Sequence, residues 1–161
     1  MRQFLGHLQA DEMEMDYGPA KELLPAQAFA LFRGMSAGDQ RHALCVLRVL
    51  DRDGEPSQAL RRAALLHDVG KACGDLKMWH RVLGVAAGAV DETLLSRLAS
   101  SDDGLYVQAH HADLGARLCE EVGLSPFVVD LVRYHESPLE EMDDPTLHEA
   151  LAALKAADDV C

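Results

Sequence analysis

Apolar residues recur every three or four positions through most of this chain, which is the spacing of an amphipathic α-helix. β-branched runs and strict apolar-polar alternation, the patterns of strands, are scarce, whereas Ala and Leu are abundant. We therefore predict an all-α fold in the form of a single-domain helical bundle. A chain of 161 residues is long enough for one domain with a substantial core and short for two.

Local signals divide the first half of this pattern into helices. An opening helix is predicted over residues 20–33, and Ser36 with Asp39 resembles a capping arrangement that starts the next helix. That second helix is apolar nearly all round over residues 43–50, which places it in the middle of the core. The segment DRDGEPS ends it, and Pro56 suits the first turn of the third helix.

The second half predicts further helices. The segment GDLKMWHRVLGVAAGAV is helical in pattern, and a short helix follows around residues 91–99. His110 and His111 precede the apolar run LGARLCEEV, so we expect both at or near a helix N-terminus, where imidazole is more easily kept neutral. Two pairs of a capping residue and a proline start the last two helices: Ser125 with Pro126, and Asp144 with Pro145.

The first 18 or so residues are acidic, so we expect a flexible or frayed arm at residues 1–18 and a folded domain at residues 19–161. The start, MRQFLGHLQADEMEMD, has neither the continuous apolar region nor the cleavage site of a signal peptide, which favours a cytoplasmic protein. No apolar run approaches the roughly 20 residues needed to span a bilayer, so a membrane partner is not expected.

The formal net charge of −12 repels a nucleic-acid backbone, which disfavours a nucleic-acid-binding module. Between Pro56 and Val90, however, basic residues outnumber acidic ones, as an anionic small substrate would require. The basic residues there are Arg61, Arg62, Lys71, Lys77 and Arg81.

The four cysteines are scattered and contain no C-x-x-C pair, so neither a zinc finger nor a disulfide framework is expected. They are Cys45, Cys73, Cys119 and Cys161.

The segment AALLHDVGK ends an apolar helix with His67 and Asp68, which offer a metal ion two unlike ligands. Taken alone, such a pair is an ordinary structural arrangement near a helix end, with Gly70 supplying the stop. The spacing places Leu60, Ala64, His67 and Lys71 on one face.

Other polar residues that bind metals interrupt apolar helix faces elsewhere: His42, His110-His111, His135 and Asp158-Asp159. Each would otherwise require its own buried hydrogen-bond partner, whereas one shared metal centre explains them together. The pattern leaves open which member of each adjacent pair is the ligand.

The order H, HD, H, H, D resembles the HD superfamily of metal-dependent phosphohydrolases over about residues 36–161. Neighbouring letters match as well: the glycine and lysine of HDVGK, the H-x-x-x-G-A form of residues 111–116, and YHE at residues 134–136. After YHES comes PLEEMDDP, without the glycine-tyrosine-proline signature of the branch that cleaves cyclic-di-GMP, so that substrate is not expected.

The resemblance implies the metal ligands. His42, His67, Asp68 and Asp158 would hold one metal, and His111 and His135 would hold a second with Asp68 as a bridge. One or two divalent transition metal ions are implied, and this ligand mix suits iron, manganese, cobalt or zinc.

Lys71 shares the ligand face and carries a point charge on a flexible stem, so we expect it to neutralise a phosphate and assign it to catalysis with Asp68 and to substrate binding. The resemblance adds His80 and Arg81 as residues that bind the phosphorylated substrate. Glu136 is either an acceptor that orients an imidazole or a surface residue.

The implied function is hydrolysis of a nucleotide or related phosphate ester with metal-activated hydroxide, and dinucleoside polyphosphates and nucleoside monophosphates are the candidate substrates. The alternative is a non-catalytic HD or HDOD-like module that senses nucleotides.

Overall fold

A computed structural model of the protein describes residues 15–74 and 104–161. These residues form α-helices and short 3₁₀ helices and no strand, which confirms the predicted all-α fold. The elements are α1 (Gly18–Leu23), α2 (Ala26–Gly34), α3 (Ala37–Asp53), α4 (Gln58–Leu66), η1 (Val69–Gly74), α7 (Gly104–Glu121), α8 (Pro126–Tyr134), η2 (Leu139–Glu141) and α9 (Pro145–Asp158). The helices predicted between residues 75 and 103 lie outside the described part of the chain.

The opening helix predicted over residues 20–33 is in fact two helices. Pro25 separates α1 from α2, because proline has no N–H to donate and its ring clashes with the preceding turn. Most of the predicted arm, residues 1–14, lies outside the described residues. Tyr17 packs its ring edge-on against Phe32 at a centroid distance of 6.3 Å.

Helix α3 begins as predicted. The Ser36 hydroxyl accepts a hydrogen bond from the Asp39 backbone N–H at 3.1 Å and donates to the Asp39 carboxylate at 2.6 Å. Helix α4 begins later than predicted, because Ser57 is its N-cap and accepts from the Leu60 N–H at 3.2 Å. Pro56 therefore precedes the cap, and its predicted place in the first turn is wrong.

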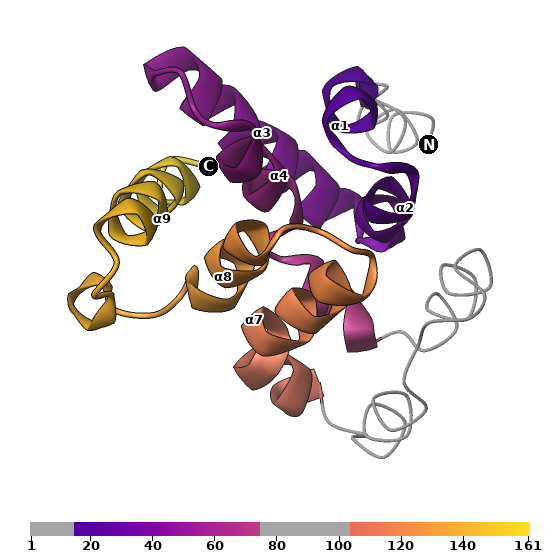
Figure 1. Cartoon of the computed structure of the whole chain (residues 1–161). Coiled ribbons are helices and arrows are strands. Elements are labelled where there is room, and N and C mark those ends of the chain that lie inside the picture. The colour runs from indigo at the N-terminus through magenta and orange to yellow at the C-terminus, as the bar shows by residue number, and fades with distance from the viewer. Residues whose placement is uncertain (1–14, 75–103) are drawn as a thin grey trace, which may run out of the picture.

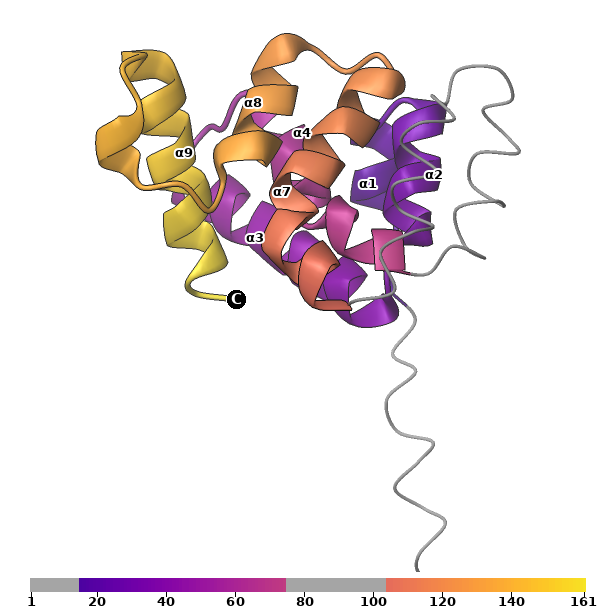
Figure 2. The ribbon, with the colours of Figure 1, turned by 90° about the horizontal axis from the view of Figure 1, so that it is seen from below.

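Helix α4 lies in the middle of the bundle, between α3 and α8, in both Figure 1 and Figure 2. Its residues Ala63, Ala64, Leu65 and Leu66 have no exposed surface. Helix α7 packs on η1 and α8, and α9 packs on α3 and α8. Because the second half of α4 is buried, the residues that follow its last turn emerge inside the protein.

Helix α7 begins at Gly104, so His110 and His111 lie in its middle and the predicted N-terminal position is wrong. The reason is that His111 belongs to a buried stripe with Val107, Leu114 and Leu118, whose spacing of four, three and four residues continues one helix through both histidines.

The cysteines also depart from expectation, because Cys45 of α3 and Cys161, which follows α9, form a disulfide with Cα atoms 5.9 Å apart. Cys73 and Cys119 are free and buried. Among the described helices, none combines the length and the apolar character that crossing a membrane would need.

Candidate metal centre

His67 and His135 are oriented by the ends of their own helices. Each is the C-cap residue of its helix, α4 and α8 respectively. The His67 Nδ1 lies 3.0 Å from the Ala64 carbonyl oxygen, and the His135 Nδ1 lies 2.7 Å from that of Val132. A carbonyl oxygen can only accept, so both Nδ1 atoms carry the proton and both Nε2 atoms of the neutral rings keep a lone pair for a metal.

The first cluster of potential ligands consists of His42, His67 and Asp158, whose nearest donor atoms all lie within 4.8 Å of one another. The Asp158 Oδ1 lies 2.7 Å from the His42 Nε2 and 3.3 Å from the His67 Nε2. Three elements supply this cluster: α3, the end of α4 and the last residue of α9.

The second cluster consists of Asp68, His111 and His135, which also lie within 4.8 Å of one another and are all buried. The Asp68 Oδ1 lies 3.6 Å from the His111 Nε2 and 3.8 Å from the His135 Nε2. Helices α7 and α8 supply the two imidazoles.

Asp68 connects the clusters. Its Oδ1 faces the second cluster, while its Oδ2 lies 3.5 Å from the His67 Nε2 of the first. The four rings form a continuous row from His42 through His67 and His135 to His111, with 5.3 Å between the centroids at each step. The carboxylate therefore stands where a ligand shared by two metal ions would stand.

Gly70 brings the second cluster together through a close backbone approach. A Cβ atom at Gly70 would lie 1.9 Å from the His111 carbonyl oxygen and 2.7 Å from the Gly115 nitrogen. Helix α4 already ends at Leu66, four residues before Gly70. Gly70 does not have the positive φ of a helix-ending glycine, because among the described glycines only Gly123 has one. The prediction that Gly70 supplies the helix stop is therefore wrong, and its lack of a side chain lets η1 touch α7.

Electrostatics keep the carboxylates ionised. Burial would raise the pKa of Asp68, but the neighbouring His67 and the Lys71 ammonium, 2.7 Å from Oδ2, outweigh it and lower that pKa. Contact with His67 and then His42 holds the pKa of the Asp158 carboxyl well below its usual range.

The pKa values of the two histidines His135 and His67 shift in opposite directions. Burial lowers the pKa of His135 to about 4. Burial also acts to lower the pKa of His67, but the carboxylates of Asp158 and Asp68 outweigh it and raise that pKa. Near neutral pH the second cluster thus contains a carboxylate and a neutral imidazole, the protonation states that a metal needs.

The surroundings of the His67 Nε2 test whether a metal ion fits this site. The His67 side chain is only 2% exposed, and its Nε2 has no partner in hydrogen-bonding geometry. Leaving a buried polar nitrogen unsatisfied is costly unless something else binds it. Imidazoles with carboxylates are the donor set of divalent transition metals, so these residues fit such ions.

The clusters open onto a cavity of about 530 Å³, a size typical of small-molecule sites. Its wall is formed by His42, Asp68, Lys71, His135, Glu136, Lys155, Asp158 and Asp159. Sequence reasoning missed Lys155, although its position three residues before Asp158, on the same helix face, was a usable signal. A second cavity of similar volume has a mainly apolar wall that includes Val49, Phe127 and Ala153, and none of its lining residues is a histidine.

The structure thus places the six sequence-predicted ligands and Lys71 around one site. It also distinguishes the adjacent pairs: His111 is buried in the second cluster whereas His110 is exposed, and Asp158 belongs to the first cluster whereas Asp159 is an exposed wall residue. The Glu136 Oε1 lies 3.6 Å from the His111 Nε2, on a side chain that is 60% exposed.

Of the three described basic residues from the neighbourhood expected in the sequence, Lys71 lines the cavity and the two arginines are directed elsewhere. Arg61 binds the Asp51 carboxylate at 2.7 Å, and Arg62 donates to the Leu23 carbonyl oxygen at 2.8 Å. His80 and Arg81, predicted to bind substrate, lie outside the described residues.

A protein-family model described as "HD domain" matches residues 41–161, well over half of the chain. No curated protein and no solved structure matches the chain.

Proposed function

This chain belongs to the HD domain family, a superfamily of metal-dependent phosphohydrolases, and we propose that it hydrolyses a phosphate ester or anhydride of a nucleotide. The observation that carries this proposal is the pair of three-ligand clusters joined by Asp68 beside a cavity. A divalent metal bound in such clusters supplies Lewis acidity, which lowers the pKa of water and polarises phosphoryl oxygens.

The protein's own residues hold and orient that chemistry. His42, His67 and Asp158 would bind one ion, and His111 and His135 would bind a second, with Asp68 shared between them. The backbone carbonyl bonds of His67 and His135 prevent their rings from turning, so their Nε2 atoms remain directed at the ligand positions.

Two lysines supply positive charge for the phosphate. Lys71 comes from η1 and Lys155 from α9, and both line the cavity beside Asp68. In the described structure the Lys71 ammonium donates to the Asp68 Oδ2, and a phosphate oxygen is an equivalent acceptor for it. We assign Lys71 and Lys155 to binding the anionic part of the substrate.

The proposed substrate class is a nucleotide, with dinucleoside polyphosphates and nucleoside monophosphates as the candidates. The cavity volume of about 530 Å³ is compatible with ligands of this size. The two ammonium groups suit an anion that carries more than one negative oxygen.

A second candidate function is a module that binds a nucleotide without consuming it. One observation favours it: the contacts from Lys71 to Asp68 and from His42 to Asp158, both 2.7 Å, already pair the carboxylates with basic side chains. Both carboxylates therefore have a partner of the opposite kind without a metal ion.

The deciding experiment is metal analysis of protein purified without chelator, combined with a hydrolysis screen over nucleotides and dinucleoside polyphosphates. We expect between one and two equivalents of a transition metal, together with turnover. Asp68→Ala should abolish turnover and lower the metal content while helical content is retained. Asp53→Ala, which changes an exposed aspartate at the end of α3, is the matched control and should match the wild type.

The outcomes separate the two functions. The protein is reconstituted in turn with iron, manganese, cobalt and zinc. If it then binds a nucleotide but forms no product, the sensing module is favoured. Undiminished turnover in Asp68→Ala would show that the site is assigned wrongly.

A further inference from the structure

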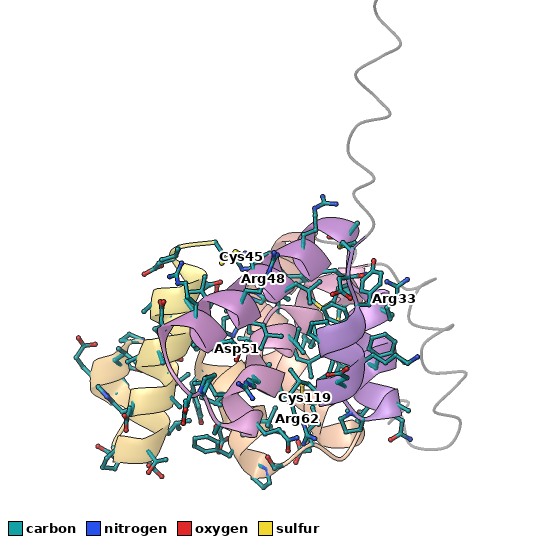
Figure 3. All side chains as sticks on the ribbon, turned by 90° about the horizontal axis from the view of Figure 1, so that it is seen from above. Arg33, Cys45, Arg48, Asp51, Arg62 and Cys119 are labelled. Carbon is teal, nitrogen blue, oxygen red and sulfur yellow. A yellow bond between two sulfur atoms is a disulfide. The ribbon has the colours of Figure 1, made fainter. Side chains whose placement is uncertain are left out.

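The disulfide joins the two segments that bring His42 and Asp158 together. Cys45 lies three residues after His42 on α3, and Cys161 lies three residues after Asp158. Both pairs consequently span the same sequence separation of 116 residues. Figure 3 shows Cys45 on α3 beside the yellow end of α9.

The buried packing of α9 ends one residue before Asp158. The buried residues of this helix are Leu151, Leu154 and Ala157, and Asp158 is its last residue. The contact between His42 and Asp158 is partly open to solvent, with side chains 29% and 39% exposed. Helix ends of this kind open readily, so a covalent bond three residues away strongly limits how far the Asp158 carboxylate can move.

Thiol chemistry in the described residues is concentrated at this bond. Burial raises the pKa of both Cys73 and Cys119 to about 12, so their reactive thiolates are scarce at neutral pH. Cys161 is exposed and Cys45 is half-buried, so a reductant can reach the disulfide.

We propose that Cys45 and Cys161 form a redox modification site that controls metal binding at the cluster of His42, His67 and Asp158. A dithiol supplies two electrons and two protons: the Cys45–Cys161 bond breaks, each cysteine becomes a thiol, and the dithiol becomes a disulfide. The end of α9 is then released, and Asp158 no longer stays beside the two imidazoles.

The two clusters should respond differently, because the disulfide touches the elements of only one of them. Asp68, His111 and His135 belong to the region after α4, to α7 and to α8, and none of these elements carries Cys45 or Cys161. Reduction should therefore weaken the first metal position and spare the second. This inference rests on the proposed metal centre, so its test needs a readout that works without metal.

The experiment compares oxidised and phosphine-reduced protein. Denatured protein should show two free thiols before reduction and four after it. In metal-free protein, amide hydrogen exchange over residues 151–161 should become at least about tenfold faster on reduction. Zinc titration should then show one of two affinities weakened at least about tenfold, and the other unchanged.

The double variant Cys45→Ser/Cys161→Ser is the control. It should resemble the reduced wild type whether or not the phosphine is present, which separates bond cleavage from any effect of the reductant on the metal. Four free thiols in protein equilibrated with air, or equal exchange and equal zinc affinity in both redox forms, would overturn the inference. Absence of zinc binding in both forms would overturn the metal centre too, whereas equal binding would overturn only the redox control.

Discussion

At the scale of single residues, the buried His67 and His135 share one kind of Nδ1 partner but differ in their surroundings. His67 and His135 both donate from Nδ1 to the carbonyl oxygen three residues earlier, in the last turn of their helices. The bond is local, so each ring is set in place as soon as its helix ends. What differs is the surroundings, because His67 meets two carboxylates whereas burial dominates at His135.

That difference predicts a pH dependence in metal-free protein. The pKa of His135 is about 4 in the folded state against 6.5 for an ordinary histidine. Between these values the unfolded chain binds a proton at this position and the folded chain does not, so this group's contribution to stability falls as pH falls. The slope is about 1.4 kcal/mol per pH unit at most.

Chemical denaturation of the wild type and of His135→Gln in the presence of a chelator measures the contribution of His135 to stability at each pH. The wild type should lose more stability than the variant between pH 6.5 and 4, and the difference should level off below that range. His67 has the opposite sign, because its raised pKa stabilises the folded state at low pH, and this residue is present in both proteins. Parallel curves for the two proteins would contradict the assignment of a depressed pKa to His135.

The adjacent pair His110 and His111 gives a second prediction at this scale. His111→Gln should lower metal binding at the second cluster at least about 100-fold, because it removes a ligand. His110→Gln changes an exposed neighbour in the same helix and should leave metal binding as in the wild type. Isothermal titration with zinc measures both, and equal losses in the two variants would contradict the assignment.

The sequence predicted the set of ligand residues but not the choice within this pair. Consecutive residues of a helix point about 100° apart, so the choice depends on which face is buried. The stripe through Val107, Leu114 and Leu118 decides it for His111, and that stripe becomes visible only once the helix is extended back to Gly104.

At the scale of elements, the approach of η1 to α7 determines where the second cluster forms. The backbone at Gly70 meets the backbone of His111, one of the cluster's own ligands. We therefore expect Gly70→Ala to destabilise the protein by about 3 kcal/mol or more, because a backbone carbonyl cannot move aside as a flexible side chain can. Displacement of α7 should also weaken metal binding at the second cluster.

Urea denaturation and zinc titration of this variant test both effects. Gly38→Ala is the matched control, because a Cβ at Gly38 meets only the Ser36 hydroxyl oxygen, at an ordinary 3.6 Å. That change lies near the start of α3 and should be neutral or stabilise by up to about 1 kcal/mol. A Gly70→Ala protein as stable as the control would show that η1 and α7 do not meet in this way.

Helix starts were predictable where a side chain signals them directly. Ser36 and Asp144 accept the hydrogen bonds of their caps as predicted, and Ser125 occupies the N-cap position of α8 without a side-chain cap bond. The prolines were less informative, because Pro25 interrupts a predicted helix and Pro56 stands before the cap. A proline is disfavoured in the interior of a helix, but its position alone does not predict at which residue the next helix begins.

At the scale of the whole molecule, the Cys45–Cys161 bond closes most of the chain into a loop. In the chain-entropy description, a loop of this length makes the unfolded state less favourable by about 4–5 kcal/mol. Reduction should therefore lower the free energy of unfolding by up to that amount. Urea titrations monitored by circular dichroism, with and without a phosphine reductant, measure the change, and the Cys45→Ser/Cys161→Ser variant should not respond to the reductant.

A bond between such distant positions was not predictable from local patterns, which describe helices one at a time. The information was nevertheless present in the sequence. Once His42 and Asp158 are taken as ligands of one ion, a cysteine three residues after each of them becomes a candidate pair. The metal site therefore gives the long-range contact that the cysteine spacing alone did not.

The origin of the ligands along the chain also sets an order of events during synthesis. Translation supplies Asp68, His111 and His135 before it supplies Asp158, and domains begin to fold while the ribosome is still adding residues. The second cluster can therefore close before α9 docks, whereas the first has to wait for α9. An ion captured early would bind at Asp68 and would already be in place when the last helix arrives.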